Sequence, residues 1–366
     1  MLRAVVFMVC LISFMAVAED VETWIISGQS NACGRAAVPG AEGHEKVQTY
    51  DPASRKWVLA AEPLKLGGTV GPWLKAAAHI GKAGIPLRLT GYASGGQLIS
   101  HWDEKQSGAT GLFAAIQRDG INGDVFLWYQ GESDGKEGMD SETYKNKLKD
   151  LVERVRTAAK NPQMVVVVIQ LGAWKSTSGD FMPIREAQRQ FVIADKNAIL
   201  VPALGRVMGD YVHLSKEGYF EMGDEIARAL FKTRYKREKE SAGWPGPVLD
   251  NAVLGADGKS IVAHFAEVKQ LGGIRAEDFG VLEGGVVVKA VKADGQKTRV
   301  ALTLERAVKL PAKLVYGIGQ VPAATLVDEA GNRAPAVQLE LTTGAIPEER
   351  ETLAPNGAGA PAKSAK

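Results

Sequence analysis

The chain has 366 residues, of which 45% are hydrophobic and 23% are charged, and its formal net charge is +2. This length is enough for one large domain and a smaller one, and the composition is that of an ordinary globular protein. Charges of both signs are interspersed, and no basic stripe is interleaved with aromatic residues. The sequence therefore argues against a protein that binds nucleic acid electrostatically.

The first 18 residues have the pattern of a secretory signal peptide. The basic start MLR precedes the apolar run AVVFMVCLISFMAV, and the small residues at 16–18 fit a cleavage site after Ala18. The alternative is a membrane anchor, but the apolar run is shorter than the roughly 20 residues that a span needs. We therefore expect a secreted or periplasmic protein that is free of the membrane after cleavage. Cys33 would then be the single cysteine, so no internal disulfide is expected.

Apolar runs and helical patterns alternate from residue 22 to about residue 236. The apolar runs are mostly continuous, as in strands that are buried on both faces of a parallel sheet. The predicted strands are residues 23–28, 86–93, 124–131, 163–172 and 198–204. The predicted helices are residues 72–84, 110–120, 141–160, 182–196 and 215–236. This alternation predicts an α/β domain at residues 19–240, in which helices cover both faces of a parallel sheet.

The sequence pattern changes after Lys236. A charged segment with proline and glycine, KREKESAGWPGP at 236–247, is followed by short β-rich runs that Gly and Asp turns interrupt. The predicted strands there are residues 258–265, 285–291, 299–304, 312–318 and 336–341. They predict a small antiparallel β-sandwich at residues 245–345. Residues 346–366 are rich in Pro, Gly, Ala and charged residues, and we expect a disordered tail.

The stretch GQSN, residues 28–31, follows the first predicted strand directly. Ligands bind beyond the carboxyl ends of the strands in such sheets, so Ser30 lies where a nucleophile is expected. Gly28 permits a sharp turn, and the first N–H groups of a helix favour negative charge. The alternative is that Ser30 is only a helix N-cap. Ser94 in GYASGG is a rival nucleophile, but neither serine has the G-x-S-x-G pattern of the α/β-hydrolases.

His213 is the histidine best placed to act as a general base. It lies in GDYVHLSKEGY, between the last predicted strand of the α/β domain and its last helix, and Asp210 comes three residues earlier. A carboxylate on the same short loop can orient the imidazole, as in a Ser-His-Asp triad. The alternative is a turn residue followed by a histidine at a helix start. His79 fits a packed helix, and His101 fits either a surface loop or the lining of a cleft.

Two segments could donate hydrogen bonds to the oxyanion of a tetrahedral intermediate. Gln130 ends the third predicted strand in WYQGESD, so its side-chain amide would lie at the sheet edge. Gly71 offers a loop N–H before Pro72, although proline there is also an ordinary helix start. Glu132 and Asp134 are interpreted as loop scaffolding, because no motif supports a glycosidase with paired carboxylates.

Four elements follow one another along the chain: GQSN, VGPW, WYQGESD and DYVHL. Together they resemble the SGNH hydrolase superfamily, and more narrowly its carbohydrate esterase branch, which includes sialate O-acetylesterases and family 6 acetylxylan esterases. GGQLISHW is similar to the Gly-Gly loop ending in Trp of that branch. The resemblance covers about residues 22–236 and implies a three-layer α/β/α, flavodoxin-like sheet. The β-rich region is more loosely similar to the C-terminal part of sialate O-acetylesterase-like proteins.

The resemblance also implies roles for individual residues. Ser30 matches the nucleophile, His213 the base and Asp210 its partner. The backbone of Ser30, Gly71 and Gln130 match the oxyanion hole, and Gln in place of the superfamily's usual Asn is typical of the carbohydrate esterase branch. The implied substrate-binding residues are Gln29, Asn31, Gly95, Gly96, Trp102 and Glu132.

These observations predict a secreted serine esterase that removes O-acetyl groups from carbohydrate, of sialate or acetylxylan type, through an acetyl-enzyme. A lipase or thioesterase on the same fold would need an apolar cleft, whereas these loops are rich in Gly, Ser, Gln and Trp. The alternative outside enzymes is a carbohydrate-binding protein without catalysis. The sequence has no cluster with metal-ligand spacing, so neither a metal nor a cofactor is expected. The sequence leaves the oligomeric state open.

Overall fold

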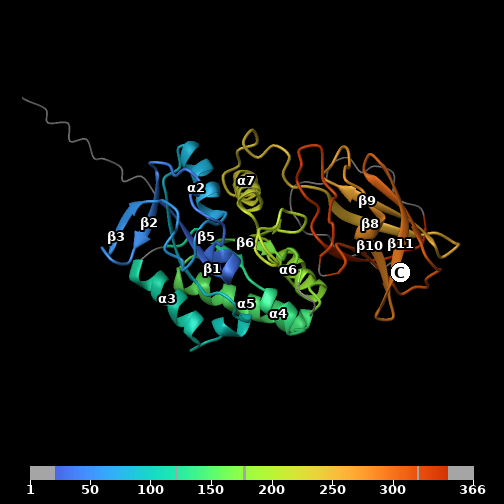
Figure 1. Ribbon diagram of the computed structural model, residues 1–366, viewed down its shortest axis with the longest axis horizontal. Helices are drawn as coiled ribbons and strands as arrows, with labels where there is room; N and C mark the ends of the chain where they lie inside the picture. The colour runs from blue at the N-terminus through green and yellow to red at the C-terminus, as the bar shows by residue number, and fades with distance from the viewer. Residues whose placement is uncertain (1–20, 120–121, 176–178, 320, 345–366) are drawn as a thin grey trace, which may run out of the picture.

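The computed structural model describes residues 21–119, 122–175, 179–319 and 321–344. The predicted signal peptide at 1–18 and the predicted tail at 346–366 lie outside these ranges. Two domains follow each other along the long axis of the molecule, the N-terminal one in blue to yellow and the C-terminal one in orange (Figure 1). No helix within the described ranges combines the length and the apolar character that a membrane span requires.

The N-terminal domain is built on a seven-stranded sheet. In spatial order its strands are β3 (Lys56–Leu59), β2 (Val47–Asp51), β4 (Leu87–Ala93), β1 (Glu22–Gly28), β5 (Val125–Tyr129), β6 (Val165–Gln170) and β7 (Ala198–Pro202). Neighbouring strands run parallel, except that β3 pairs antiparallel with β2. The order β4-β1-β5-β6-β7 is the 2-1-3-4-5 order of flavodoxin-like sheets. The expected α/β fold is therefore confirmed, with a β2–β3 hairpin added at one edge.

Helices cover both faces of this sheet, which makes the domain three-layered (Figure 1). One face carries α2 (Trp73–Lys82) and α7 (Lys216–Thr233), and the other carries α3 (Ser107–Asp119), α5 (Ser141–Ala158) and α6 (Met182–Ala194). Both long helices have a side-chain N-cap: Asp140 accepts from Thr143 N before α5, and Ser215 accepts from Gly218 N before α7. Short helices follow three strand ends: α1 (Ser30–Cys33), η1 (Ile99–Trp102) and α4 (Glu132–Lys136).

The C-terminal domain is one antiparallel sheet of seven strands with its own apolar core. In spatial order they are β14 (Val337–Glu340), β13 (Lys313–Tyr316), β10 (Phe279–Glu283), β11 (Val286–Gln296), β12 (Arg299–Leu304), β9 (Ser260–Ala266) and β8 (Val248–Leu254). The short helix η2 (Ala276–Asp278) precedes β10. Leu254 N donates to Thr342 O (2.9 Å), and Thr342 N donates to Ala252 O (3.1 Å), so the two edges of the sheet meet. The expected β domain is confirmed, and its sheet is closed in a barrel-like way.

Buried polar side chains join the two domains. Arg185 of α6 is fully buried and donates from Nη1 to the carbonyl oxygens of Gly317 (3.1 Å) and Gly319 (2.8 Å) in the β domain. Gln170, at the end of β6, exchanges two hydrogen bonds of 2.8 Å with the backbone of Ala336. Burial lowers the pKa of Arg185 to about 9, so its guanidinium is charged at neutral pH. The β domain is therefore attached to α6 and to the carboxyl end of β6 in the large sheet.

Candidate active site

Ser30 lies at the switch point of the sheet, where β1 has β4 on one side and β5 on the other. Gly28 ends β1 with φ = 135°, and a Cβ at this position would lie 2.0 Å from the carbonyl oxygen of Tyr129. Only glycine fits both the conformation and the close approach. Gln29 N donates to that same oxygen (3.0 Å), and α1 begins directly at Ser30. The strand-to-helix corner therefore fixes Ser30 at the carboxyl edge of the sheet.

Ser30, His213 and Asp210 form a line of hydrogen bonds. Ser30 Oγ lies 2.9 Å from His213 Nε2, and His213 Nδ1 lies 2.7 Å from Asp210 Oδ2. The other carboxylate oxygen, Asp210 Oδ1, accepts from the backbone N–H groups of Val212 (2.8 Å) and His213 (2.7 Å). Burial alone would raise the pKa of Asp210, but these hydrogen bonds outweigh it and the pKa is lowered. An ionised carboxylate thus faces the imidazole, which in turn can take the proton of the Ser30 hydroxyl.

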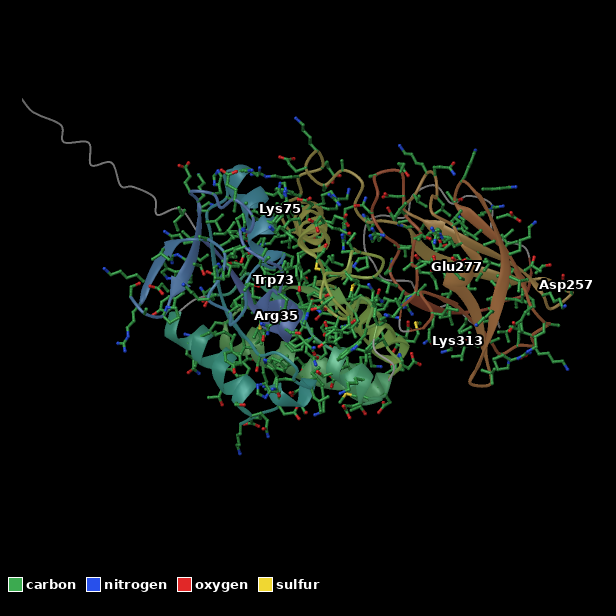
Figure 2. All side chains as sticks on the ribbon, in the orientation of Figure 1. Arg35, Trp73, Lys75, Asp257, Glu277 and Lys313 are labelled. Carbon is green, nitrogen blue, oxygen red and sulfur yellow. The ribbon has the colours of Figure 1, made fainter. Side chains whose placement is uncertain are left out.

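Gly95 and Gly96 are both exposed, and Gly95 borders Ser30; the space between Gly95 and Ser30 is the mouth of the site. A Cβ at Gly95 would lie 3.5 Å from Ser30 Cβ and 2.9 Å from Arg35 Nη2, so the missing side chain keeps the mouth open. Arg35 is exposed and lies at this mouth; it is labelled in Figure 2, close to α1. The structure therefore places Gly95 beside Ser30, whereas a Cβ at Gly96 would have no neighbour within 4 Å.

Four of the residues expected to bind substrate are buried in this structure. Gln29 is 2% exposed, and its Oε1 lies 3.4 Å from Ser133 N in the α4 turn. Trp102 is fully buried and packs edge-on against Trp128, with 5.1 Å between the ring centroids. These two side chains have no surface that a substrate can reach.

Asn31 and Glu132, the other two, form a buried network behind Ser30. Asn31 Nδ2 donates to Glu132 Oε1 (2.6 Å) and to Val212 O (3.2 Å), while Tyr219 OH donates to Asn31 Oδ1 (2.6 Å). Val212 directly precedes His213, so Asn31 ties the nucleophile's helix to the loop of the histidine. In this structure both side chains therefore contact protein groups behind the reacting residues. Sequence reasoning missed Tyr219, although it follows His213 by six residues in the same segment.

The two predicted oxyanion donors are placed differently from expectation. Gln130 is fully buried, and its Nε2 donates to Gln97 O (2.9 Å), Gln29 Oε1 (3.3 Å) and Asp134 Oδ2. Because an amide nitrogen has only two protons, protein acceptors occupy both, and Gln130 does not offer a free donor here. The N–H of Gly71 lies 3.5 Å from Glu62 Oε1, at the long limit of a hydrogen bond.

The loop of Gly71 is nevertheless held against α1. Trp73 Nε1 donates to Ala32 O (2.7 Å), and Thr69 N donates to Gly34 O (3.0 Å). Trp73 is labelled near Arg35 in Figure 2. Ser30 N begins α1, and the helix supplies no acceptor for the N–H of its first residue. The N–H groups of Ser30 and Gly71 are therefore the remaining candidates for oxyanion donors.

The buried carboxyl group of Glu132 predicts an unusual dependence of stability on pH. Burial raises its pKa to about 7, and its Oε2 has no hydrogen-bond partner within the described ranges. Because the pKa is higher in the folded than in the unfolded state, the protonated Glu132 contributes fully to the free energy of unfolding below about pH 4.5. This contribution is lost as the pH rises to 7. Glu132→Gln should therefore flatten the decline of the unfolding free energy between pH 5 and pH 8 by on the order of 2–3 kcal/mol.

Urea denaturation at a series of pH values measures this effect. Glu153→Gln, which removes an exposed carboxylate from α5, is the matched control and should keep the wild-type slope. Equal slopes for wild type and Glu132→Gln would show that the buried carboxyl does not titrate in this range.

Other singled-out residues lie away from the reacting groups. Cys33 is 3% exposed, and burial raises the pKa of its thiol, which fits a packing role. His79 bonds Asp224 between α2 and α7 (2.7 Å), and His264 bonds Asp250 in the β domain (2.7 Å). Within the described ranges, no group of three or more His, Cys, Asp or Glu side chains could hold a metal ion.

Comparison with known proteins identifies the family. The family model described as "Carbohydrate esterase, sialic acid-specific acetylesterase" matches residues 20–232, which include Ser30 and His213. The chain belongs to this family. The chain is similar to a probable carbohydrate esterase of Arabidopsis thaliana, with 26% identity over 239 residues. The match covers 57% of this chain and 89% of the relative.

Two solved structures share the fold of this carbohydrate esterase. A carbohydrate acetylesterase from Xanthomonas citri superposes with a TM-score of 0.66 at 16% identity, covering 87% of this chain and 80% of that one. A protein of Arabidopsis thaliana superposes with a TM-score of 0.52 at 24% identity, covering 58% and 98%. The resemblance to SGNH carbohydrate esterases is thus confirmed, and the protein is a carboxylic ester hydrolase of the carbohydrate acetylesterase kind.

Proposed function

We propose that this esterase removes O-acetyl groups from a sialate- or xylan-type glycan with Ser30, His213 and Asp210 as its catalytic triad. The observation that carries the proposal is the line of hydrogen bonds from Asp210 through His213 to Ser30 Oγ, at the switch point of the sheet. Its distances of 2.7 and 2.9 Å need no rearrangement before proton transfer. The family of the chain supports the acetyl ester as the bond that is broken.

Each step of the reaction then uses a group of this chain. Ser30 Oγ attacks the acetyl carbonyl carbon as its proton passes to His213 Nε2, and the negative charge develops on the carbonyl oxygen. The N–H groups of Ser30 and Gly71 stabilise that oxyanion. The imidazolium then gives its proton to the sugar oxygen as the bond between that oxygen and the acetyl carbon breaks, and the sugar leaves with a free hydroxyl group. A water molecule, deprotonated by His213, then attacks the acetyl carbon; the bond to Ser30 Oγ breaks, Oγ takes the proton back from His213, and acetate leaves.

The proposal is tested by trapping the acetyl-enzyme. The protein is mixed with p-nitrophenyl acetate, quenched in acid within one turnover, digested and analysed by mass spectrometry. We expect one acetyl group on the peptide that contains Ser30. Acetylation of the Ser94 peptide instead would move the nucleophile, and acetate release without any acetylated peptide would contradict a covalent mechanism. Acetate release from acetylated xylan and from O-acetylated sialic acid then separates the two glycan types.

A further inference from the structure

A polar groove of about 790 Å³ is lined in part by Gly96, the residue that follows Gly95. Its lining comes from the loop after β4, from η1 and the residues that follow it, from α4 and from the segment after β6. The lining residues that matter here are Gly96, Gln97, His101, Gln106, Ser133 and Trp174. This volume is much larger than an acetyl group needs and falls within the about 300–1,000 Å³ of clefts that hold whole small molecules.

The lining of the groove lies near the reacting groups. Gly96, in its lining, directly follows Gly95, whose missing side chain borders Ser30. On the other side, the ring of Trp174 lies 6.1 Å from that of Tyr211, which lies 6.4 Å from the imidazole of His213. The lining of the groove therefore comes within one residue of the glycine that borders Ser30 and within two ring contacts of His213.

The chemistry of the lining suits a neutral polyhydroxylated ligand. Gln97 and Gln106 carry amides, Ser133 carries a hydroxyl group, and Trp174 provides an aromatic ring. Aromatic faces with planar polar side chains are what the apolar faces and the hydroxyl groups of sugars require. Trp174 is held in place by a stacked contact with Phe181, with centroids 5.9 Å apart and an interplanar angle of 18°.

Two ring nitrogens in this lining have no partner within the described ranges. Trp174 Nε1 and His101 Nε2 are both shielded from solvent and make no hydrogen bond there. Unpaired buried polar atoms are rare in native proteins and call for an explanation. Burial lowers the pKa of His101, so its imidazole is neutral at neutral pH and adds no charge to the groove.

The charges at the groove are balanced. Asp103 is paired with Lys147 (2.6 Å), and Lys136 lies 3.7 Å from Glu137. The exposed cation near Ser30, Arg35, lies against Gly95 and is not part of the lining. The groove therefore has no excess positive charge that would select an anionic chain.

We propose that this groove binds the neutral oligosaccharide chain on which the acetylated sugar is carried, with Trp174 stacking on a sugar ring. The inference rests on the proposed function and makes it more specific: the substrate is an acetylated neutral glycan chain and not an isolated acidic sugar. Sugars next to the acetylated one contribute binding energy from the groove while the acetyl group lies at Ser30.

Kinetics against chain length test the proposal. Acetate release is measured on acetylated xylose and on acetylated xylo-oligosaccharides of two to six units. For wild type, kcat/KM should rise with length until the groove is filled. In Trp174→Ala, kcat/KM for the hexamer should fall by about 10- to 100-fold, mainly through KM, and most of the dependence on length should disappear. Gln106→Ala, which changes an exposed residue at the rim, should weaken the same dependence on length. It replaces Trp174→Ala in the test if that variant does not fold.

Direct binding separates this inference from the proposed function. Ser30→Ala protein is titrated with unacetylated xylohexaose in a calorimeter, and this measurement of binding needs no catalysis. Trp174→Ala is compared with Trp57→Ala on β3, the matched aromatic control, each in the Ser30→Ala protein. Binding that Trp174→Ala abolishes and Trp57→Ala retains is the expected result. Absence of binding together with a flat length profile would overturn the groove while leaving Ser30 chemistry intact. Tighter binding of sialic acid than of xylohexaose would overturn the neutral-chain assignment.

Discussion

Replacement of Ser30 by alanine is expected to lower kcat for hydrolysis of p-nitrophenyl acetate by about 10³- to 10⁶-fold, because the covalent route then has no nucleophile. The fold should be unaffected, since Ser30 Oγ makes its hydrogen bond to His213 and the backbone of α1 is held by other groups. Activity is measured by release of nitrophenolate, and folding by circular dichroism and thermal unfolding.

Asp210→Asn tests the orienting carboxylate separately. The Asn oxygen can still accept from Val212 N and His213 N, so the loop should keep its shape. An amide opposite Nδ1 favours the wrong imidazole tautomer, and kcat should fall by about 10⁴-fold, as the same exchange does in serine proteases.

Ser94→Ala is the matched control for both variants, because Ser94 is held through its backbone N–H to Gly28 O (2.9 Å). It should keep wild-type activity. Full activity in Ser30→Ala, or loss of activity in Ser94→Ala alone, would remove Ser30 from the mechanism.

The sequence predicts the central strands and the reacting groups because both depend on local signals. Five mostly apolar runs correspond to β1, β4, β5, β6 and β7, and among these β1, β5 and β6 are almost entirely buried. Asp210 and His213 share one short loop, so a spacing of three residues is enough to bring the carboxylate to Nδ1. Ser30 needs only a strand end and a glycine that can adopt φ = 135° at Gly28.

The roles of neighbouring residues could not be predicted in the same way. Asn31 and Glu132 stand next to reacting or loop residues, but their side chains turn inward because their partners come from distant parts of the chain. Glu132 is 101 residues from Asn31, and Tyr219 is 188 residues from it. Nearness in sequence to a reacting residue therefore does not distinguish side chains that face the substrate from side chains that support the backbone behind it.

The elements that the sequence prediction missed have weak patterns. The β2–β3 hairpin is short, and β3 is mostly exposed, so neither strand shows a continuous apolar run. In the β domain, β8 and β10 were also missed, since VLDNAVL and FGVLE mix polar residues and glycine with short apolar stretches. The sequence position of Trp174 could have indicated a residue near the active site, because Trp174 follows the fourth predicted strand at the same sheet edge as Ser30.

Replacement of Arg185 by methionine is expected to lower the free energy of unfolding by about 3–5 kcal/mol, because it removes a buried charge that several carbonyl groups surround. Besides Gly317 and Gly319, the guanidinium donates to Leu171 O (3.2 Å) and Gly172 O (2.6 Å). Methionine has a similar length and fills much of the space, so the loss reports the unpaired carbonyl groups more than a cavity.

Arg189→Met is the matched control, because Arg189 also lies on α6 and reaches Gln338 O of the β domain (3.3 Å) but is partly exposed. Its loss should cost about 1 kcal/mol or less. Urea denaturation followed by circular dichroism compares the two variants. Gly172 lies two residues before Trp174, so Arg185→Met should also weaken the dependence of kcat/KM on oligosaccharide length, because the segment that carries the indole loses its anchor. Equal stability of the two variants would mean that Gln170 and the apolar contacts hold the domains together without the guanidinium.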